Sequence, residues 1–235
     1  MPAPSATSPS PTSSPRAQRA DGAEARQRLL LTALRLFSEQ GFARTSTRQV
    51  AEAAGVNLAA IRYYFADKAG LYLAALTEPL GAARDLIPLY DQPQLSLRAS
   101  LQAYIHYHLQ LLRQGEIVQQ CMRLHMREML EPTGQWAEEL EQDVGRQHAA
   151  LVGILRRRLG LARADDDVHR LAFSIAGLCF HLITCHDLLH GIRPSLIATP
   201  RALDTWCERL VQQALALAAC EAARRGLPFS PDTSA

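Results

Sequence analysis

Apolar residues recur at helical spacing along most of the chain. In the segment 24–40 they occupy one helix face, and Gly41 follows where a helix would end. The same period continues in later segments, without the alternating runs and hairpin signals of strands. Helices are expected at residues 24–40, 48–55, 58–65, 68–87, 95–114, 117–130, 134–159, 166–190 and 200–225. The pattern predicts an all-α fold.

The stretch VNLAAIRYYF, which ends at Phe65, has helix-turn-helix spacing with the residues before it. Ala51 is small enough for two helices to cross closely, Gly55 permits a positive φ in the tight turn, and Ile61 anchors the second helix. The small core of this unit is expected from Val50, Val56 and Ile61. Because successive helix residues point about 100° apart, the three residues after Ile61 cannot all face inward with it.

Those three residues are Arg62, Tyr63 and Tyr64. An exposed guanidinium and phenols suit a recognition helix in the major groove, where Arg reads guanine or phosphate and Tyr hydroxyls reach phosphate oxygens. The alternative is that Tyr63 or Tyr64 packs against the first helix while Arg62 is simply solvated.

The segment TSTRQVAEAAGVNLAAIRYYFADKAGLYLAAL, residues 45–76, closely resembles the DNA-binding part of the TetR family of transcriptional regulators. That family runs from a TxRxVAxxAGV element through a short recognition helix to a YxHFxxKxxL-like ending. The resemblance implies an N-terminal three-helix DNA-binding domain at 24–70 and a larger helical ligand-binding and dimerisation domain at 71–226. It also implies a homodimer that binds palindromic double-stranded operator DNA.

The resemblance further implies a set of DNA-contacting residues. Thr47 and Arg48 would hold phosphates, and Lys68 would hold another at the start of the next helix. The expected DNA face comprises Asn57, Ala60, Arg62, Tyr63 and Tyr64. Arg62 stands where the family usually carries Tyr, and Tyr64 replaces a frequent His, so the operator sequence is not transferred from other members.

Two later segments suggest how the second domain assembles. The apolar helices at 171–189 and 203–223 have broad faces, which two subunits would bury as a four-helix bundle near 166–190 and 200–225. The alternative is that both helices belong to the core of one subunit. The segment MRLHMREMLEPT at 122–133 resembles the CecR-like branch of the family, which implies efflux or detoxification genes as targets.

A small-molecule inducer is expected to bind among apolar and aromatic residues of this domain. The candidates are Tyr104, His108, Met122, His125, Met126, Trp136, Phe173 and Phe180. Methionine and aromatic residues at helical spacing are also typical of an ordinary core.

Two histidine-containing pairs suggest a different kind of sensor. His181 and Cys185, like His186 and His190, are four residues apart, so each pair shares a helix face and has the spacing to hold a transition metal. No HExxH or Cys/His quartet completes such a site, and a metal- or thiol-responsive sensor is kept as an alternative. We expect no metal and no cofactor.

Catalysis is not expected, and no catalytic residue is assigned. The sequence contains no GxSxG elbow, P-loop or GxGxxG motif to organise its Ser, His and acidic residues. A helical ligand carrier or an enzyme without DNA binding is the competing interpretation, which the set of Thr47, Arg48, Tyr63 and Lys68 opposes.

Composition agrees with a folded cytoplasmic protein. The chain has 235 residues, of which 48% are hydrophobic and 20% charged, with no apolar run long enough for a membrane span and no secretory signal pattern. Residues 1–23, rich in Pro, Ser and Thr, are expected to be a disordered arm, and 227–235 a disordered tail. The five cysteines lack CxxC spacing, so they are expected to be reduced.

Charge is distributed unevenly. Residues 1–70 carry nine basic and five acidic side chains, whereas the remainder carries sixteen and eighteen, and the positive part is the expected DNA-binding part. We therefore expect a TetR-type regulator, a repressor released from its operator by ligand. The helix at 68–87, interrupted by Pro79, is expected to be kinked or divided and to transmit the change between domains.

Overall fold

The computed structural model describes residues 15–81, 83–112, 115–135 and 137–232, and these residues form helices without any β-strand. The N-terminal part contains α1 (Pro15–Gln40), α2 (Thr47–Ala54), α3 (Leu58–Phe65) and α4 (Lys68–Thr77). The remainder contains η1 (Ala83–Leu86), α5 (Ile87–Tyr90), α6 (Leu97–Leu111), α7 (Glu116–Leu130), α8 (Ala137–Arg158), α9 (Asp166–Thr184), α10 (His186–Ile192), η3 (Pro194–Leu196) and α11 (Pro200–Arg224). The predicted all-α fold is confirmed.

Helix α1 begins earlier than predicted. Residues 15–23, which were expected within the disordered arm, are helical, while residues 1–14 lie outside the described part of the chain. Pro15 suits the first turn of a helix because its φ is already close to the helical value. The Ala, Arg, Gln and Glu residues that follow favour helix, and they outweigh the Pro- and Ser-rich composition that precedes them.

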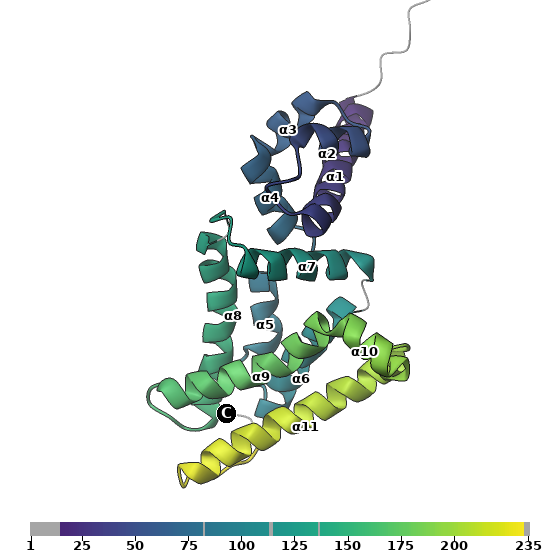
Figure 1. Cartoon of the computed structure of the whole chain (residues 1–235). Helices are drawn as coiled ribbons and strands as arrows, with labels where there is room; N and C mark the ends of the chain where they lie inside the picture. The colour runs from purple at the N-terminus through teal and green to yellow at the C-terminus, as the bar shows by residue number, and fades with distance from the viewer. Residues whose placement is uncertain (1–14, 82, 113–114, 136, 233–235) are drawn as a thin grey trace, which may run out of the picture.

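Helix α7 lies between the N-terminal helices and the rest of the molecule (Figure 1). Its residues Cys121 and Leu124 are fully buried in the same apolar cluster as Leu34, Phe37 and Leu71 of α1 and α4. The core beneath α2 and α3 is therefore completed by a helix that begins only at Glu116, long after α4 ends at Thr77.

A second core fills the C-terminal part. Helices α6, α8, α9 and α11 contribute most of its buried apolar residues, with Leu101, Leu155, Ile175 and Ala214 completely inaccessible to solvent. This burial holds α9 and α11 side by side, with part of each helix left uncovered (Figure 1).

Two predicted helices are interrupted. Helix α4 ends at Thr77, and the segment around Pro79 is not helical, so the proline divides the expected 68–87 helix. The expected 166–190 helix is broken at Cys185, where α9 and α10 meet at 65°. The Thr184 hydroxyl donates to the Phe180 carbonyl at 2.8 Å, a side-chain bond that competes with the helical ladder and favours a bend.

Within the described ranges, no single helix is both long and apolar enough to cross a membrane, and only the bent pair of α9 and α10 meets the criterion of length and composition when the two are joined.

The C-terminal segment after α11 is ordered against the core, which corrects the predicted disordered tail. Leu227 and Phe229 pack on the C-terminal core, and the Arg98 amide donates to the Pro231 carbonyl at 3.0 Å. Arg98 also pairs with Asp232 at 2.5 Å. Two apolar side chains and one ion pair outweigh the Pro and Ser content of residues 227–232; residues 233–235 lie outside the described part.

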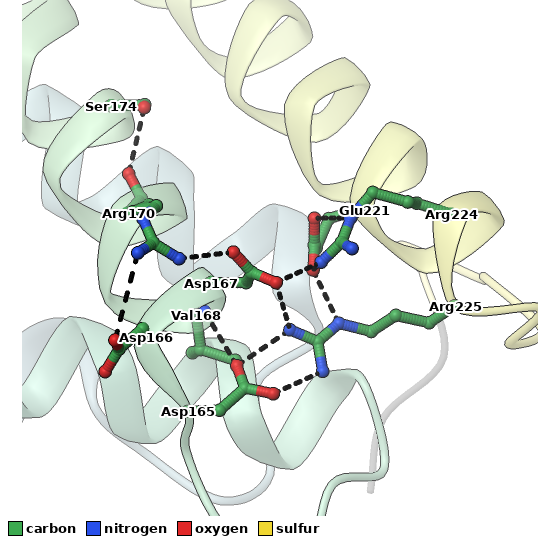
Figure 2. Close-up of polar contacts among 9 residues, drawn as sticks. All are labelled: Asp165, Asp166, Asp167, Val168, Arg170, Ser174, Glu221, Arg224 and Arg225. Carbon is green, nitrogen blue, oxygen red and sulfur yellow. Dashed lines mark hydrogen bonds and ion pairs between the residues drawn. The ribbon is translucent and has the colours of Figure 1, made fainter.

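Acidic residues at the start of α9 pair with two arginines at the end of α11 (Figure 2). The Arg225 guanidinium donates two hydrogen bonds of 2.7 Å to the Asp165 carboxylate. Arg224 pairs with Asp167, and Glu221 accepts hydrogen bonds from both arginines. These contacts fix the start of α9 relative to the end of α11.

The pairs lower the pKa values of the acids. The hydrogen bonds from Arg225 hold the pKa of Asp165 well below its usual range, and hydrogen bonds from Arg170 and then Arg224 lower the pKa of Asp167. A carboxyl group with a depressed pKa in the folded state stabilises that state fully above its unfolded pKa of about 4. The stabilisation is lost as the pH falls through the folded-state value.

We predict that Asp165→Asn is less stable than the wild type at pH 7 but loses less stability between pH 7 and pH ~3. Asn still caps α9, so the change isolates the ion pair from the cap that Asp165 provides to the Val168 amide. Thermal unfolding across a pH series measures this. Asp166→Asn removes the same charge one residue away and serves as the control; equal pH profiles for the two variants would contradict the assignment.

Candidate nucleic-acid interface

The turn between α2 and α3 has the geometry expected of a helix-turn-helix. Gly55 has φ 64°, a left-handed conformation that is unfavourable for residues with a β-carbon. Its amide donates to the Glu52 carbonyl at 3.1 Å, and the Val56 amide donates to the Ala51 carbonyl at 3.0 Å. This pair of bonds satisfies the last carbonyls of α2 and sets the angle at which α3 leaves the turn.

Side chains beneath the turn form the predicted small core. Val50 and Ile61 are almost completely buried, Ala51 is buried at the helix crossing, and Val56 packs partly against them. Phe65, one turn after Ile61, is also buried. The inner face of α3 is therefore apolar, and its orientation is fixed by packing.

The outer face of α3 carries the candidate base-reading residues. Arg62 is exposed, and the side chain of Tyr63 is 82% exposed. Asn57 is exposed as well, but its Oδ1 accepts the Ala59 amide at 2.8 Å and so caps the helix. The cap holds the first turn of α3 in place. The side-chain amide nitrogen of Asn57 remains available to donate a hydrogen bond.

Tyr64 and Ala60 are placed differently from the rest of the predicted DNA face. Both are half-buried and pack against the N-terminal core. The Tyr64 ring lies edge-on to Tyr63, with 4.8 Å between centroids, and its hydroxyl would be 3.1 Å from a β-carbon at Gly22 of α1. For Tyr64 the structure therefore agrees with the alternative of packing on the first helix, while Tyr63 faces solvent.

The candidate phosphate-binding residues lie at two helix beginnings. Thr47 is the first residue of α2 and is half-buried, and Arg48 beside it is exposed. Lys68 is the first residue of α4, and its Nζ lies 4.4 Å from the centre of the Phe42 ring. The ring attracts the ammonium group and holds it near the start of α4, where the amide dipoles also favour an anion.

Leu58 is exposed on the first turn of α3 and is a further candidate contact residue that sequence reasoning did not include. An apolar side chain there can contact the methyl group of thymine. The helical period did not signal this exposure, because Leu58 lies three residues before the buried Ile61 and the period places both on the same side of the helix.

A tight turn connects α3 to α4. Ala66 has φ 66°, and the Asp67 amide donates to the Phe65 carbonyl at 2.8 Å. Asp67 caps α4 by accepting the Gly70 amide at 2.9 Å. A β-carbon at Gly70 would lie only 2.0 Å from the Phe65 carbonyl oxygen, so the turn requires glycine at this position.

The residues proposed for ligand binding are not gathered in one place. Tyr104 and His108 are neighbours on α6, with ring centroids 4.3 Å apart, and Met122, His125 and Met126 lie on α7. Phe173 and Phe180 are 63% and 46% exposed on α9, and Trp136 lies outside the described residues.

The two histidines of this set are half-buried and held by backbone bonds. His108 Nδ1 lies 2.8 Å from the Tyr104 carbonyl, and His125 Nδ1 lies 2.7 Å from the Cys121 carbonyl. Because a carbonyl only accepts, Nδ1 is the donor in each ring. Burial lowers the pKa of both side chains and favours their neutral forms.

Two clefts are lined by other residues. One, of about 280 Å³, lies between α6 and α11, and its walls include Arg98, His106 and Glu208. The other, of about 460 Å³, lies between the end of α1 and the end of α7. None of the eight predicted ligand-binding residues lines either of these two clefts.

The two histidine-containing pairs are not part of a larger set of metal ligands among the described residues. Cys185 Sγ lies 3.6 Å from His181 Nδ1, and the rings of His186 and His190 are 6.5 Å apart. Across the described ranges, no three His, Cys, Asp or Glu side chains are arranged to hold a metal ion. Burial raises the pKa of the Cys121 and Cys179 thiols to about 12, which keeps them protonated at neutral pH.

We predict that Gly70→Ala destabilises the protein by about 1–3 kcal/mol because the new methyl group overlaps the Phe65 carbonyl. Gly145→Ala in α8 is the matched control, since a β-carbon there meets no atom within 4 Å and should stabilise the helix by about 0.5–1 kcal/mol. Urea unfolding measures both. A Gly70→Ala variant as stable as the control would show that the turn relaxes without loss.

Comparison with known proteins matches the N-terminal and the C-terminal part of the chain to two different family models. The model for bacterial regulatory proteins of the tetR family matches residues 29–75, and that for the C-terminal domain of the HTH-type transcriptional dual regulator CecR matches residues 97–220. The dual regulator CecR of Shigella flexneri is 31% identical over 155 residues, which cover 61% of this chain and 69% of that protein. The regulator RutR of Escherichia coli strain K12 is 35% identical over 124 residues, 49% of this chain and 53% of that protein.

Solved structures share the fold. A tetR-family transcriptional regulator from Streptomyces coelicolor aligns with a TM-score of 0.54 at 24% identity, covering 86% of this chain and 83% of its own. The SmeT–triclosan complex aligns with a TM-score of 0.61 at 18% identity, covering 90% and 97%. The chain therefore belongs to the tetR family of bacterial regulatory proteins and is a DNA-binding transcriptional regulator with a CecR-like C-terminal domain.

Proposed function

We propose that this regulator is a cytoplasmic homodimeric repressor that binds a palindromic operator and is released by a small molecule. The observation that carries the proposal is the outer face of α3, where the exposed Arg62 and Tyr63 stand on a helix fixed by Asn57, Gly55 and the buried Ile61. A rigid, capped helix with a cationic outer face is suited to the major groove.

The proposed contacts divide by role. Arg62, Tyr63 and Leu58 face the base edges, whereas Thr47, Arg48 and Lys68 hold phosphates on either side. Ala60 and Tyr64 support the face from within, and the exposed Asn57 caps the helix and directs its free donor to the DNA. In this arrangement α2 and α4 supply register, and α3 supplies discrimination.

A single α3 reads few base pairs, so the proposal requires a dimer. Its support is an exposed apolar stripe on α9, where Phe173, Gly177 and Phe180 follow one another at helical spacing. On α11, Leu217 and Cys220 are exposed beside it. Two copies packed through α9 and α11 would cover these side chains as a four-helix bundle.

The inducer is proposed to bind in the C-terminal part beside α6 and α7. Two separate groups are its candidate contacts, Tyr104 and His108 on α6 and Met122, His125 and Met126 on α7. The solved SmeT–triclosan complex, a protein of the same fold, supports a small apolar molecule as the inducer class. Phe173 and Phe180 fit the dimer face better than a pocket. Efflux or detoxification genes remain the proposed targets.

We predict that Arg62→Ala lowers affinity for an operator selected from random duplex DNA by about tenfold or more, since one base-reading pair contributes about 1–3 kcal/mol. Shift assays across a salt series measure the loss. Arg201→Ala, an exposed arginine at the start of α11, is the control and should bind like the wild type. If Arg62→Ala keeps the affinity and sequence preference of the wild type, Arg62 does not read the operator.

We predict that Phe180→Asp weakens dimerisation by about 30-fold or more, since a central interface side chain contributes about 2 kcal/mol or more. Sedimentation equilibrium measures the dissociation constant. Leu89→Asp places the same charge at another exposed apolar position and should leave the dimer intact. Dimers of equal strength in both variants would place the interface elsewhere.

A further inference from the structure

The segment 122–133, MRLHMREMLEPT, contains three residues whose contacts are not explained by ligand or DNA binding. It covers the second half of α7 and the turn that follows. Arg127, Glu128 and Thr133 of this segment lie where α7 meets the N-terminal helices. The arrangement of these three residues determines how the two parts of the protein are joined.

Glu128 is a buried carboxylate, with 5% of the residue exposed. Its Oε2 accepts a hydrogen bond of 2.7 Å from the Tyr72 hydroxyl of α4. Its Oε1 accepts the Thr133 amide and hydroxyl, both at 2.9 Å. The Tyr72 side chain comes from the DNA-binding part, and the Thr133 groups come from the turn after α7, so one carboxylate bonds both parts of the molecule.

Tyr72 is a fixed donor. It is completely buried, and its ring packs edge-on against Phe37 and Phe42, with centroids 5.0 and 4.9 Å away. Burial, and then the bond to Glu128, raise the pKa of the Tyr72 phenol, so it keeps its proton and donates. The hydroxyl therefore cannot turn to another partner without moving the ring against the end of α1.

Arg127 makes a second contact between the same parts. Its guanidinium lies against Gly41, where a β-carbon would be 3.1 Å from Nη1, and its Nη2 is 3.4 Å from the Glu39 carbonyl. Adjacent residues of α7 thus touch the end of α1 and the middle of α4. Apolar contacts of Cys121 and Leu124 hold the same helices together, but such contacts are not directional.

We propose that Glu128, with Tyr72 and Thr133, is a positioning group that fixes the angle between the DNA-binding helices and α7. In the dimer, this angle sets the separation of the two copies of α3, and hence the half-site spacing that the protein accepts. The Glu128 cluster, meaning these three residues, acts without touching DNA. This inference rests on the proposed function, because spacing has meaning only for a dimer on a two-part operator.

The charge of Glu128 makes the arrangement selective. Breaking the Tyr72 bond removes the shortest hydrogen bond of this buried carboxylate and leaves it only the donors of Thr133, so orientations of the N-terminal helices that break the Tyr72 bond are disfavoured. A hydrogen bond to a charged group changes the equilibrium constant between orientations with and without that bond by about tenfold or more. Removing the hydroxyl should let neighbouring orientations become populated, without removing the apolar contacts that keep the parts together.

The test uses full-length protein and a series of duplexes that carry the selected half-sites at the preferred spacing and at one base pair more or fewer. One added base pair turns a half-site by about 34°, so the wild type should discriminate clearly. For Tyr72→Phe and Glu128→Gln, the ratio of affinities between preferred and altered spacing should fall about threefold to tenfold. Affinity for a single half-site should remain that of the wild type.

Tyr90→Phe is the matched control. It also removes a buried tyrosine hydroxyl, but this hydroxyl has no hydrogen-bond partner among the described residues and belongs to the C-terminal core, so spacing discrimination should be unchanged. Thr133→Val is a second variant that weakens the support of Glu128 from the α7 side while leaving Tyr72 intact. It keeps the test valid if Tyr72→Phe or Glu128→Gln fails to fold.

The outcomes separate the two levels of inference. Variants that lose thermal stability but keep the wild-type spacing ratio overturn the positioning role, because a purely structural bond would behave in this way. Relaxed spacing in Tyr72→Phe and Thr133→Val, but not in Tyr90→Phe, supports it. A wild-type protein that selects no two-part operator overturns the proposed function itself and removes the basis of this inference.

Discussion

Burial of one face of α7 against α1 and α4 is the contact on which the position of the DNA-binding helices depends. Helices α2 and α3 have eight residues each, too few to be stable alone. Their support is α1 and α4, and the core between those helices includes Cys121 and Leu124. The DNA-binding part is therefore structurally incomplete without a helix from the second part, and a displacement of α7 affects both its stability and its orientation.

The other side of α7 belongs to the C-terminal part. Val118 is buried with Leu111 of α6 and Ile183 of α9. The side-chain Nε2 of Gln119 lies 3.3 Å from His186 Nδ1. A molecule that displaced α6 or α9 would act on this face and shift the balance between orientations of the DNA-binding helices. The helix predicted at 68–87, which was expected to be kinked or divided at Pro79 and to connect the two parts, ends as α4 at Thr77. Helix α7 is the element that contacts both parts.

Local patterns were enough to predict the helix-turn-helix. Gly55, Asn57 and Ile61 act within a few residues of one another, so their roles follow from turn chemistry, capping and helical period. Contacts between distant segments were not accessible in this way. Tyr72 and Glu128 are 56 residues apart, and nothing in the spacing of either indicates the other.

The errors have identifiable causes. Composition marked the C-terminal tail as disordered, but two apolar residues and the pair of Arg98 with Asp232 place it on the core. Aromatic residues at helical spacing suggested one ligand pocket, yet whether such residues face a core, a pocket or solvent depends on which helices pack around them. Phe173 and Phe180 are exposed for this reason, whereas Tyr104 is buried.

The amino acid at the start of α4 also determines where acylating reagents can modify the molecule. Lys68 is the only lysine among 235 residues, and basic positions elsewhere are arginine. Guanidinium groups stay charged and react poorly with acylating reagents, so the chain offers one side-chain amine besides its N-terminal amine. That amine lies over the Phe42 ring, beside the helices that face DNA. Acylation, which neutralises lysine, would therefore be concentrated at the candidate nucleic-acid interface and leave the charge of the C-terminal part untouched.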